Sequence, residues 1–118
     1  MATTGWHEPT ARDQRSQLLF RQLNEQIRLV SADFGVSDEL DLVCECGNGG
    51  CFERVLVPGA EYEAVRRFPT RFIVKPGHAA ARVERVVTES RTFLVVERVG
   101  ADAAAAILLD PRRDGDRP

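Results

Sequence analysis

The sequence is poor in lysine and cysteine, and it contains no long apolar run. Nowhere do about 18 consecutive apolar residues occur, which is the length that a helix needs to cross a bilayer. The first residues also lack the basic and then apolar order of a secretion signal. We therefore expect a cytoplasmic protein without a membrane segment.

The sequence also has no large excess of acidic over basic residues. The net charge of −2 gives no general attraction to nucleic acid or to anionic lipids. Fifteen arginines stand against one lysine, Lys75, a bias that suits a GC-rich coding genome as well as a functional demand. We expect another protein as the partner, rather than nucleic acid or a membrane.

Several catalytic motifs are missing. The chain has no phosphate-binding glycine loop with its lysine, no serine-hydrolase elbow and only two histidines for acid and base work. We therefore expect no enzymatic activity and assign no catalytic residue.

What the chain does have is a cluster of cysteines. Cys44, Cys46 and Cys51 fall within eight residues, and no other cysteine occurs. Thiols stay reduced in the cytosol, where such a cluster is more often metal-binding or catalytic than disulfide-bonded. The odd number of cysteines favours the same interpretation, which is a metal site.

A histidine offers the fourth ligand. His78 follows Pro76 and Gly77 in a turn that could aim its ring at the cysteines, and the glycines between Cys46 and Cys51 permit a tight knuckle. Three thiolates and one imidazole form a Cys3His set, which binds structural zinc. The C-x-C spacing is less usual than C-x-x-C, so an iron–sulfur centre and merely buried thiols stay as alternatives.

The fourth position has alternatives too. His7 could take it, or a water molecule could leave the zinc site open for catalysis. Glu45 or Glu53 could then act as a general base. We favour instead a closed site in which both glutamates are solvent-facing strand residues.

Apolar spacing predicts an amphipathic helix from Thr10 to about Ser31. Its apolar stripe is expected to face the core, and its polar side to face solvent. The stripe consists of Leu19, Phe20, Leu23, Ile27 and Val30, and the polar side of Gln17, Arg21, Asn24 and Arg28. Leu18 and Leu29 lie off the stripe, where they widen the buried face or mark a contact with a partner.

The remaining pattern predicts an α+β fold, with this helix packed on a small, mostly antiparallel sheet that carries the zinc knuckle. Expected strands cover residues 40–46, 52–57, 71–75, 79–88 and 92–99, and short helices cover 61–67 and 102–109. Residues 1–9 are expected to form a flexible arm, 10–109 a single zinc-binding domain, and 110–118 a disordered charged tail.

Several segments stand out by their order along the chain: Leu19-Phe20-Arg21, Asn24-Glu25-Gln26-Ile27, the C-x-C-x4-C cluster, Glu61 to Arg66, Pro69 to Phe72, Pro76-Gly77-His78 and Val83 to Val87. Together they resemble a group of small uncharacterised actinobacterial proteins over most of residues 18–98. The resemblance implies that the cysteines and the histidine belong to one module. It implies no activity, substrate or partner.

We interpret the chain as a small cytoplasmic zinc-binding protein that serves as a non-enzymatic interaction or regulatory module. One alternative is a redox switch, in which oxidation of the zinc-bound thiolates ejects the metal. Another is a nucleic-acid-binding regulator with a basic patch, although interleaved glutamates would weaken its field. The patch would consist of Arg66, Arg67, Arg71, Arg82 and Arg85.

Overall fold

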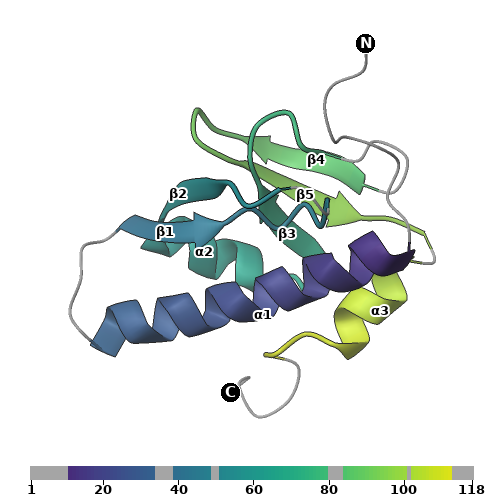
Figure 1. Cartoon of the computed structure of the whole chain (residues 1–118), viewed down its shortest axis with the longest axis horizontal. Helices are drawn as coiled ribbons and strands as arrows, with labels where there is room; N and C mark the ends of the chain where they lie inside the picture. Colours follow the sequence, from purple (N-terminus) through teal and green to yellow (C-terminus); the bar gives the residue numbers. More distant parts are fainter. Residues whose placement is uncertain (1–10, 34–38, 49–50, 80–83, 101, 113–118) are drawn as a thin grey trace.

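The computed structural model describes residues 11–33, 39–48, 51–79, 84–100 and 102–112 (Figure 1). The predicted arm of residues 1–9 lies outside these ranges. No helix of the described part is long and apolar enough to cross a membrane. The elements in chain order are α1 (Ala11–Asp33), β1 (Glu39–Val43), β2 (Arg54–Pro58), α2 (Gly59–Arg66), β3 (Arg71–Val74), β4 (Glu84–Glu89), β5 (Leu94–Arg98) and α3 (Asp102–Leu108).

The strands form two small antiparallel sheets, so the predicted α+β class is confirmed, although we expected one sheet. β1 pairs with β2, and the second sheet has the order β3-β5-β4. The sheets are linked where the backbone N–H of Glu45 donates to the carbonyl of Ile73 over 2.8 Å. A shift of register between Val86 and Thr88 interrupts the β4–β5 ladder.

Apolar side chains cover both faces of the second sheet, because successive residues of a strand point to opposite faces. Ile73 and Val95 face the β1–β2 pair and α2 in one buried cluster. Phe72, Val74 and Val96 belong to a second cluster, which includes all three cysteines. The cysteine loop is therefore part of the core.

Most of helix α1 is turned the opposite way from our prediction, although Ile27 of the predicted stripe packs against the first buried cluster. Leu19 and Val30 of the predicted core stripe are 62% and 51% exposed, whereas Arg21 and Asn24 of the predicted solvent side are fully buried. In Figure 1 the helix lies along the two sheets. The prediction assumed that the apolar side of a helix always meets the core. It was wrong because the groups beneath this helix are polar and bind its polar side chains.

The first of these partners is the edge of β1. The side-chain amide of Asn24 accepts a hydrogen bond from the backbone N–H of Val43 over 2.9 Å and donates one to its carbonyl over 2.8 Å. A neighbouring strand would supply the same two bonds. Buried backbone groups must be paired, so this amide completes the edge of the sheet.

The second partner is a group of buried side chains beneath the first half of α1. The guanidinium groups of Arg21 and Arg98 both lie over the ring of Phe72, 4.7 and 4.9 Å from its centroid. Arg98 donates to the side chain of Gln17, which in turn donates to Glu84, each over 2.7 Å. Such a network requires polar residues on the inner side of the helix.

The third partner comes from the predicted tail. Asp110 is buried and forms an ion pair with the buried guanidinium of Arg66, which also contacts Glu25 over 3.2 Å. Arg112 bonds to Glu25 over 2.7 Å and to Glu63 over 2.8 Å. Ordered contacts thus continue to Arg112, beyond the boundary expected at 109, while residues 113–118 lie outside the described part.

Replacing Asn24 with alanine should destabilise the fold strongly. Asn24→Ala leaves the backbone N–H and carbonyl of Val43 buried without their partner, at a cost of about 2–4 kcal/mol in unfolding free energy. Gln22→Ala is the matched control, because Gln22 is an exposed amide on the same helix and should change stability by less than about 0.5 kcal/mol. Urea unfolding measures both, and equal losses would contradict the role given to Asn24.

Acid should destabilise the fold through Glu25 and Asp110. Burial opposes the ionisation of both groups. For Glu25, hydrogen bonds from Arg112 and Tyr62 outweigh this effect. For Asp110, the backbone N–H of Arg112 and the charge of Arg66 outweigh it. Both groups therefore have a lowered pKa. Their stabilising effect is complete above the unfolded pKa values of about 4.3 for Glu25 and about 3.9 for Asp110, and it is lost as the pH falls through the lower folded values.

Unfolding free energy measured between about pH 6 and about pH 2 tests this expectation. Asp110→Asn should lower the stability at pH 6 and flatten the acid dependence. Asp41→Asn, which removes an aspartate from an exposed ion pair with Arg54, should leave the curve nearly unchanged. An acid dependence that is identical in all three proteins would contradict the role of Asp110.

Candidate metal centre

The first two cysteines lie in the loop that follows β1, and not on one face of a longer strand as we expected. β1 ends at Val43. Cys44 continues the pairing by one bond, from its backbone N–H to the carbonyl of Glu53 over 2.9 Å. The next backbone N–H, that of Glu45, donates to β3 and not to β2, so β1 does not continue to Cys46.

A tight knuckle then leads to the third cysteine. Gly47 has a φ of 78°, a conformation that glycine adopts without strain. The backbone N–H of Cys51 donates to the carbonyl of Asn48 over 2.9 Å and closes the loop. Residues 49–50 lie outside the described part. The knuckle brings Cys51 back beside Cys44 at the start of the segment that leads to β2.

The turn after β3 brings in His78, as the sequence predicted. The backbone N–H of His78 donates to the carbonyl of Lys75 over 3.0 Å, and Gly77 has a φ of 90°. Proline at the second position and glycine at the third are typical of a type II turn. The turn places the Nδ1 atom of His78 3.7 Å from the sulfur of Cys44 and 3.6 Å from that of Cys51.

The side chains of all four predicted ligand residues converge. The ligand atoms of Cys44, Cys46, Cys51 and His78 lie within 4.8 Å of one another. The cysteines are free thiols and are buried. Within the described ranges this is the one group of histidine, cysteine or acidic side chains so placed that it could hold a metal ion. The alternative ligand His7 lies outside those ranges.

The electrostatics of the cluster favour a cation. A hydrogen bond from the Cys44 thiol lowers the pKa of Cys46 to about 5, and the same bond raises the pKa of Cys44. Burial raises the pKa of Cys51. One thiolate therefore opposes ionisation of its neighbours, whereas a bound metal ion would stabilise all three thiolates. The backbone N–H of Lys75, 3.1 Å from the Cys44 sulfur, adds a donor to the group.

Glu45, which we expected to face solvent, is buried between the two cysteines. One carboxylate oxygen accepts from the side chain of Asn24 over 2.7 Å and the other from the backbone N–H of Ile73 over 2.9 Å. Burial raises its pKa. Both oxygens are engaged in holding α1 and β3, so Glu45 is a positioning residue. Its partners are distant in the sequence, and nothing local signals them.

Glu53, the other candidate base, faces solvent as we expected. Its side chain is more than half exposed and lies 3.5 Å from the amino group of Lys75. This ion pair joins the segment after Cys51 to the turn that carries His78. The contact is on the surface, where such pairs contribute little to stability.

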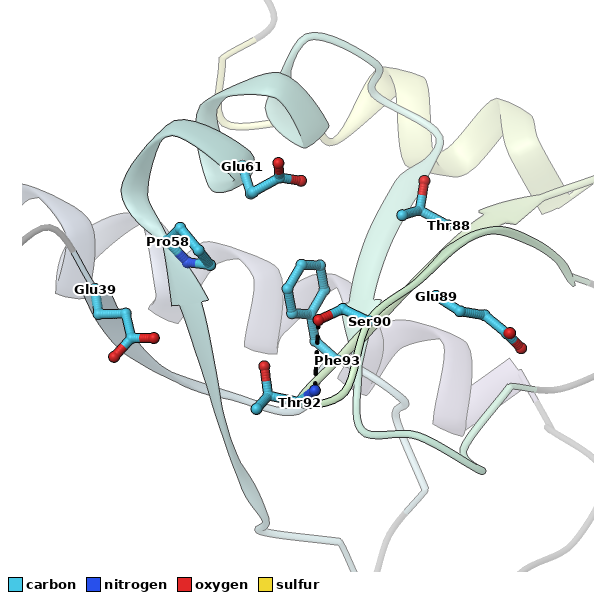
Figure 2. Close-up of a pocket in the computed structure, with 8 residues that line it drawn as sticks. All are labelled: Glu39, Pro58, Glu61, Thr88, Glu89, Ser90, Thr92 and Phe93. Atoms are coloured by element: carbon cyan, nitrogen blue, oxygen red, sulfur yellow. Dashed lines mark hydrogen bonds between the residues drawn. The ribbon is translucent and has the colours of Figure 1, made fainter.

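A concave feature, which the sequence did not signal, lies between the two sheets and the start of α2. It has a volume of about 410 Å³, and Figure 2 shows the ring of Phe93 inside it, with the carboxylates of Glu39, Glu61 and Glu89 set around it. These carboxylates are not among the side chains that converge on a possible metal position. The hollow is thus an acidic depression, separate from the cysteine cluster.

Comparison with protein-family models, with curated proteins and with solved structures gives no match for this chain. The resemblance to small actinobacterial proteins therefore stays a prediction.

Replacing one cysteine should remove the metal and destabilise the fold. Cys46→Ser should lower the metal content per chain and reduce the unfolding free energy by at least about 3 kcal/mol, because binding of a structural metal contributes directly to folding. Glu53→Ala is the control from the same loop, since Glu53 is exposed, and it should change neither quantity. Elemental analysis and thermal unfolding measure both. Equal stability of the two variants would contradict the metal centre.

Proposed function

We propose that this protein is a small cytoplasmic interaction or regulatory module, without enzymatic activity, whose fold is held by a structural zinc ion. The observation that supports the proposal is that the ligand atoms of four side chains converge, those of Cys44, Cys46, Cys51 and His78. Three thiolates with one imidazole form a common structural zinc set. An iron–sulfur cluster is normally held by four cysteines, which this chain lacks.

The distances support zinc as the metal. Zinc binds sulfur at about 2.3 Å and imidazole nitrogen at about 2.0 Å, so a tetrahedron around it has sulfur-to-nitrogen edges of about 3.5 Å. Two of the three edges from His78, those to Cys44 and Cys51, measure 3.7 and 3.6 Å. His78 thus stands at nearly the spacing from Cys44 and Cys51 that zinc requires, and the sulfur of Cys46 lies within 4.8 Å of the other ligand atoms.

The surroundings support a structural role for the ion rather than a catalytic one. Four protein ligands complete a tetrahedron and leave no position for a reactive water. Glu45 has both carboxylate oxygens engaged in the core. The ion would instead join the loop after β1, the segment before β2 and the turn after β3.

The arginines support a protein partner rather than nucleic acid. Arg66 of the proposed basic patch is buried, Arg71 and Arg85 both pair with Glu97, and Arg67 is exposed. Arg82 lies outside the described residues. Few charges of the patch are therefore available for phosphate contacts, whereas the outer side of α1 offers an apolar surface.

Metal analysis and ligand variants test the zinc site. The purified protein should contain one zinc ion per chain, and the cobalt-substituted protein should show the visible absorption of a tetrahedral thiolate site. His78→Ala should weaken zinc binding at least about tenfold, while His78→Cys should retain the ion, because a fourth thiolate also completes a tetrahedron. Zinc in both variants at the affinity of the unaltered protein would refute His78 as a ligand.

A redox switch is distinguished by zinc release. The switch requires that mild peroxide ejects the ion by oxidising the thiolates. If zinc stays bound at peroxide concentrations that oxidise exposed thiols, the ion is structural only.

A further inference from the structure

Strand β2 has a neighbouring strand on one side only. It pairs with β1, and the described residues add no third strand to this sheet. The backbone N–H and carbonyl of Val43 point away from β2, toward Asn24. Arg54 is opposite Val43 in the register, so its own N–H and carbonyl point away from β1, and those of Leu56 do the same because the pattern repeats every second residue. β2 therefore presents a row of peptide groups on its outer edge.

The rest of the domain covers little of this edge. The hydroxyl of Thr92 donates to the carbonyl of Leu56 over 2.9 Å. The described residues form no other bond to the outward peptide groups of Arg54 and Leu56. The side chain of Leu56 is 44% exposed, so the strand is open to solvent here. Strand edges with unpaired peptide groups are the templates on which a strand of another chain is added.

A basic hollow of about 320 Å³ lies beside this edge. Three of its six lining residues are cationic and none is acidic: Arg54, Leu56, Lys75, Pro76, Arg91 and Thr92. Arg91 is exposed and has no ionic partner among the described residues. The other two cations pair with carboxylates outside the hollow, over 3.2 Å to Asp41 and 3.5 Å to Glu53. Such surface pairs are weak, so an incoming carboxylate can compete for both cations.

The other end of the same strand has the opposite charge. The acidic depression of Figure 2 begins at Pro58, where β2 ends, and three glutamates surround it. Thr92 lines both hollows, and its bond to Leu56 marks the boundary between them. An acidic partner is therefore attracted to the Arg54 end of β2 and repelled from the Pro58 end.

The metal ligands hold both walls of the basic hollow. Cys51 lies just before β2, and His78 lies in the turn that also contains Lys75 and Pro76. A metal ion bound to both ligands would tie the open strand to the wall that faces it. The width of the hollow would then depend on the metal.

We propose that β2 binds an extended acidic segment of a partner protein as an added strand, at the end formed by Arg54 and Leu56. The inference names the kind of partner for the interaction module proposed above and rests on that proposal. Acidic side chains at alternate positions share one face of a strand, so they would stand together beside the cations of the hollow. Nucleic acid would contact the same cations, but its backbone has no N–H and carbonyl groups to pair with the edge.

Fluorescence anisotropy with labelled peptides of about ten residues tests the proposal on the full-length, zinc-loaded chain. A peptide in which glutamate and valine alternate should bind with a dissociation constant in the micromolar range. Replacing its glutamates with lysine should weaken binding at least about tenfold, because the charges then repel. Replacing every second valine with proline should weaken it as much, because proline has no N–H to donate to the edge.

A charge reversal on the protein tests the hollow itself. Arg91→Glu should weaken binding of the glutamate peptide at least about tenfold, since a carboxylate would then face the carboxylates of the peptide. Arg67→Glu is the matched control, because Arg67 is also an exposed arginine but does not line the hollow. It should leave binding unchanged.

Hydrogen exchange on the unaltered protein locates the added strand without a mutation. The glutamate peptide should slow exchange at the backbone N–H groups of Arg54 and Leu56, which point outward. The N–H of Val55 is the internal control, because it points toward β1 and should exchange at the same rate with and without peptide. Slower exchange at all three groups to the same degree would contradict pairing at this edge.

Zinc content and melting temperature are measured on the same samples. A folded, zinc-loaded protein that binds no glutamate peptide below about 1 mM would refute the strand site but not the zinc site. Equal binding of the glutamate peptide and its proline version would refute strand addition, and tighter binding of a single-stranded oligonucleotide would refute the acidic protein partner. Binding of the glutamate peptide by a folded chain without zinc would refute the metal proposal alone.

Discussion

The hydrogen bonds of Asn24 decide how the rest of the molecule is arranged. Its amide completes the edge of β1 at Val43 and also donates to the carboxylate of Glu45. These bonds hold the polar side of α1 inward, and they lie where β1 ends and the cysteine loop begins. One buried amide therefore links the inward side of α1 to the edge of β1 and to Glu45 in the cysteine loop.

A polar layer between a helix and a sheet constrains a fold differently from an apolar one. Apolar contacts tolerate small shifts, whereas buried polar groups are costly unless each finds its partner at hydrogen-bond distance. Arg66 meets this demand by reaching both Glu25 and Asp110. Asp110, near the end of the described chain, is thereby part of the core, because removing one member of a buried ion pair leaves the other uncompensated.

Local patterns in the sequence predicted what depends on local chemistry. The cysteine spacing, the turn at Pro76 and Gly77, and the order of helices and strands all follow from neighbouring residues. The inward side of α1 could not be predicted in this way, because its partners are remote: Gln17 bonds to Arg98, 81 residues further along. The burial of Glu45 was missed for the same reason, since nothing beside it in the sequence indicates Asn24 or Ile73.

The metal centre and the helix hold the same short segment from two sides. Cys44 and Cys46 flank Glu45, so an ion that binds both cysteines also restricts the backbone of the glutamate between them. Glu45 in turn accepts the hydrogen bond from Asn24 that keeps α1 in place. Loss of the ion would loosen this segment first and the docking of α1 next. A metal ion held by Cys44 and Cys46 would therefore help to fix which side of α1 faces the core.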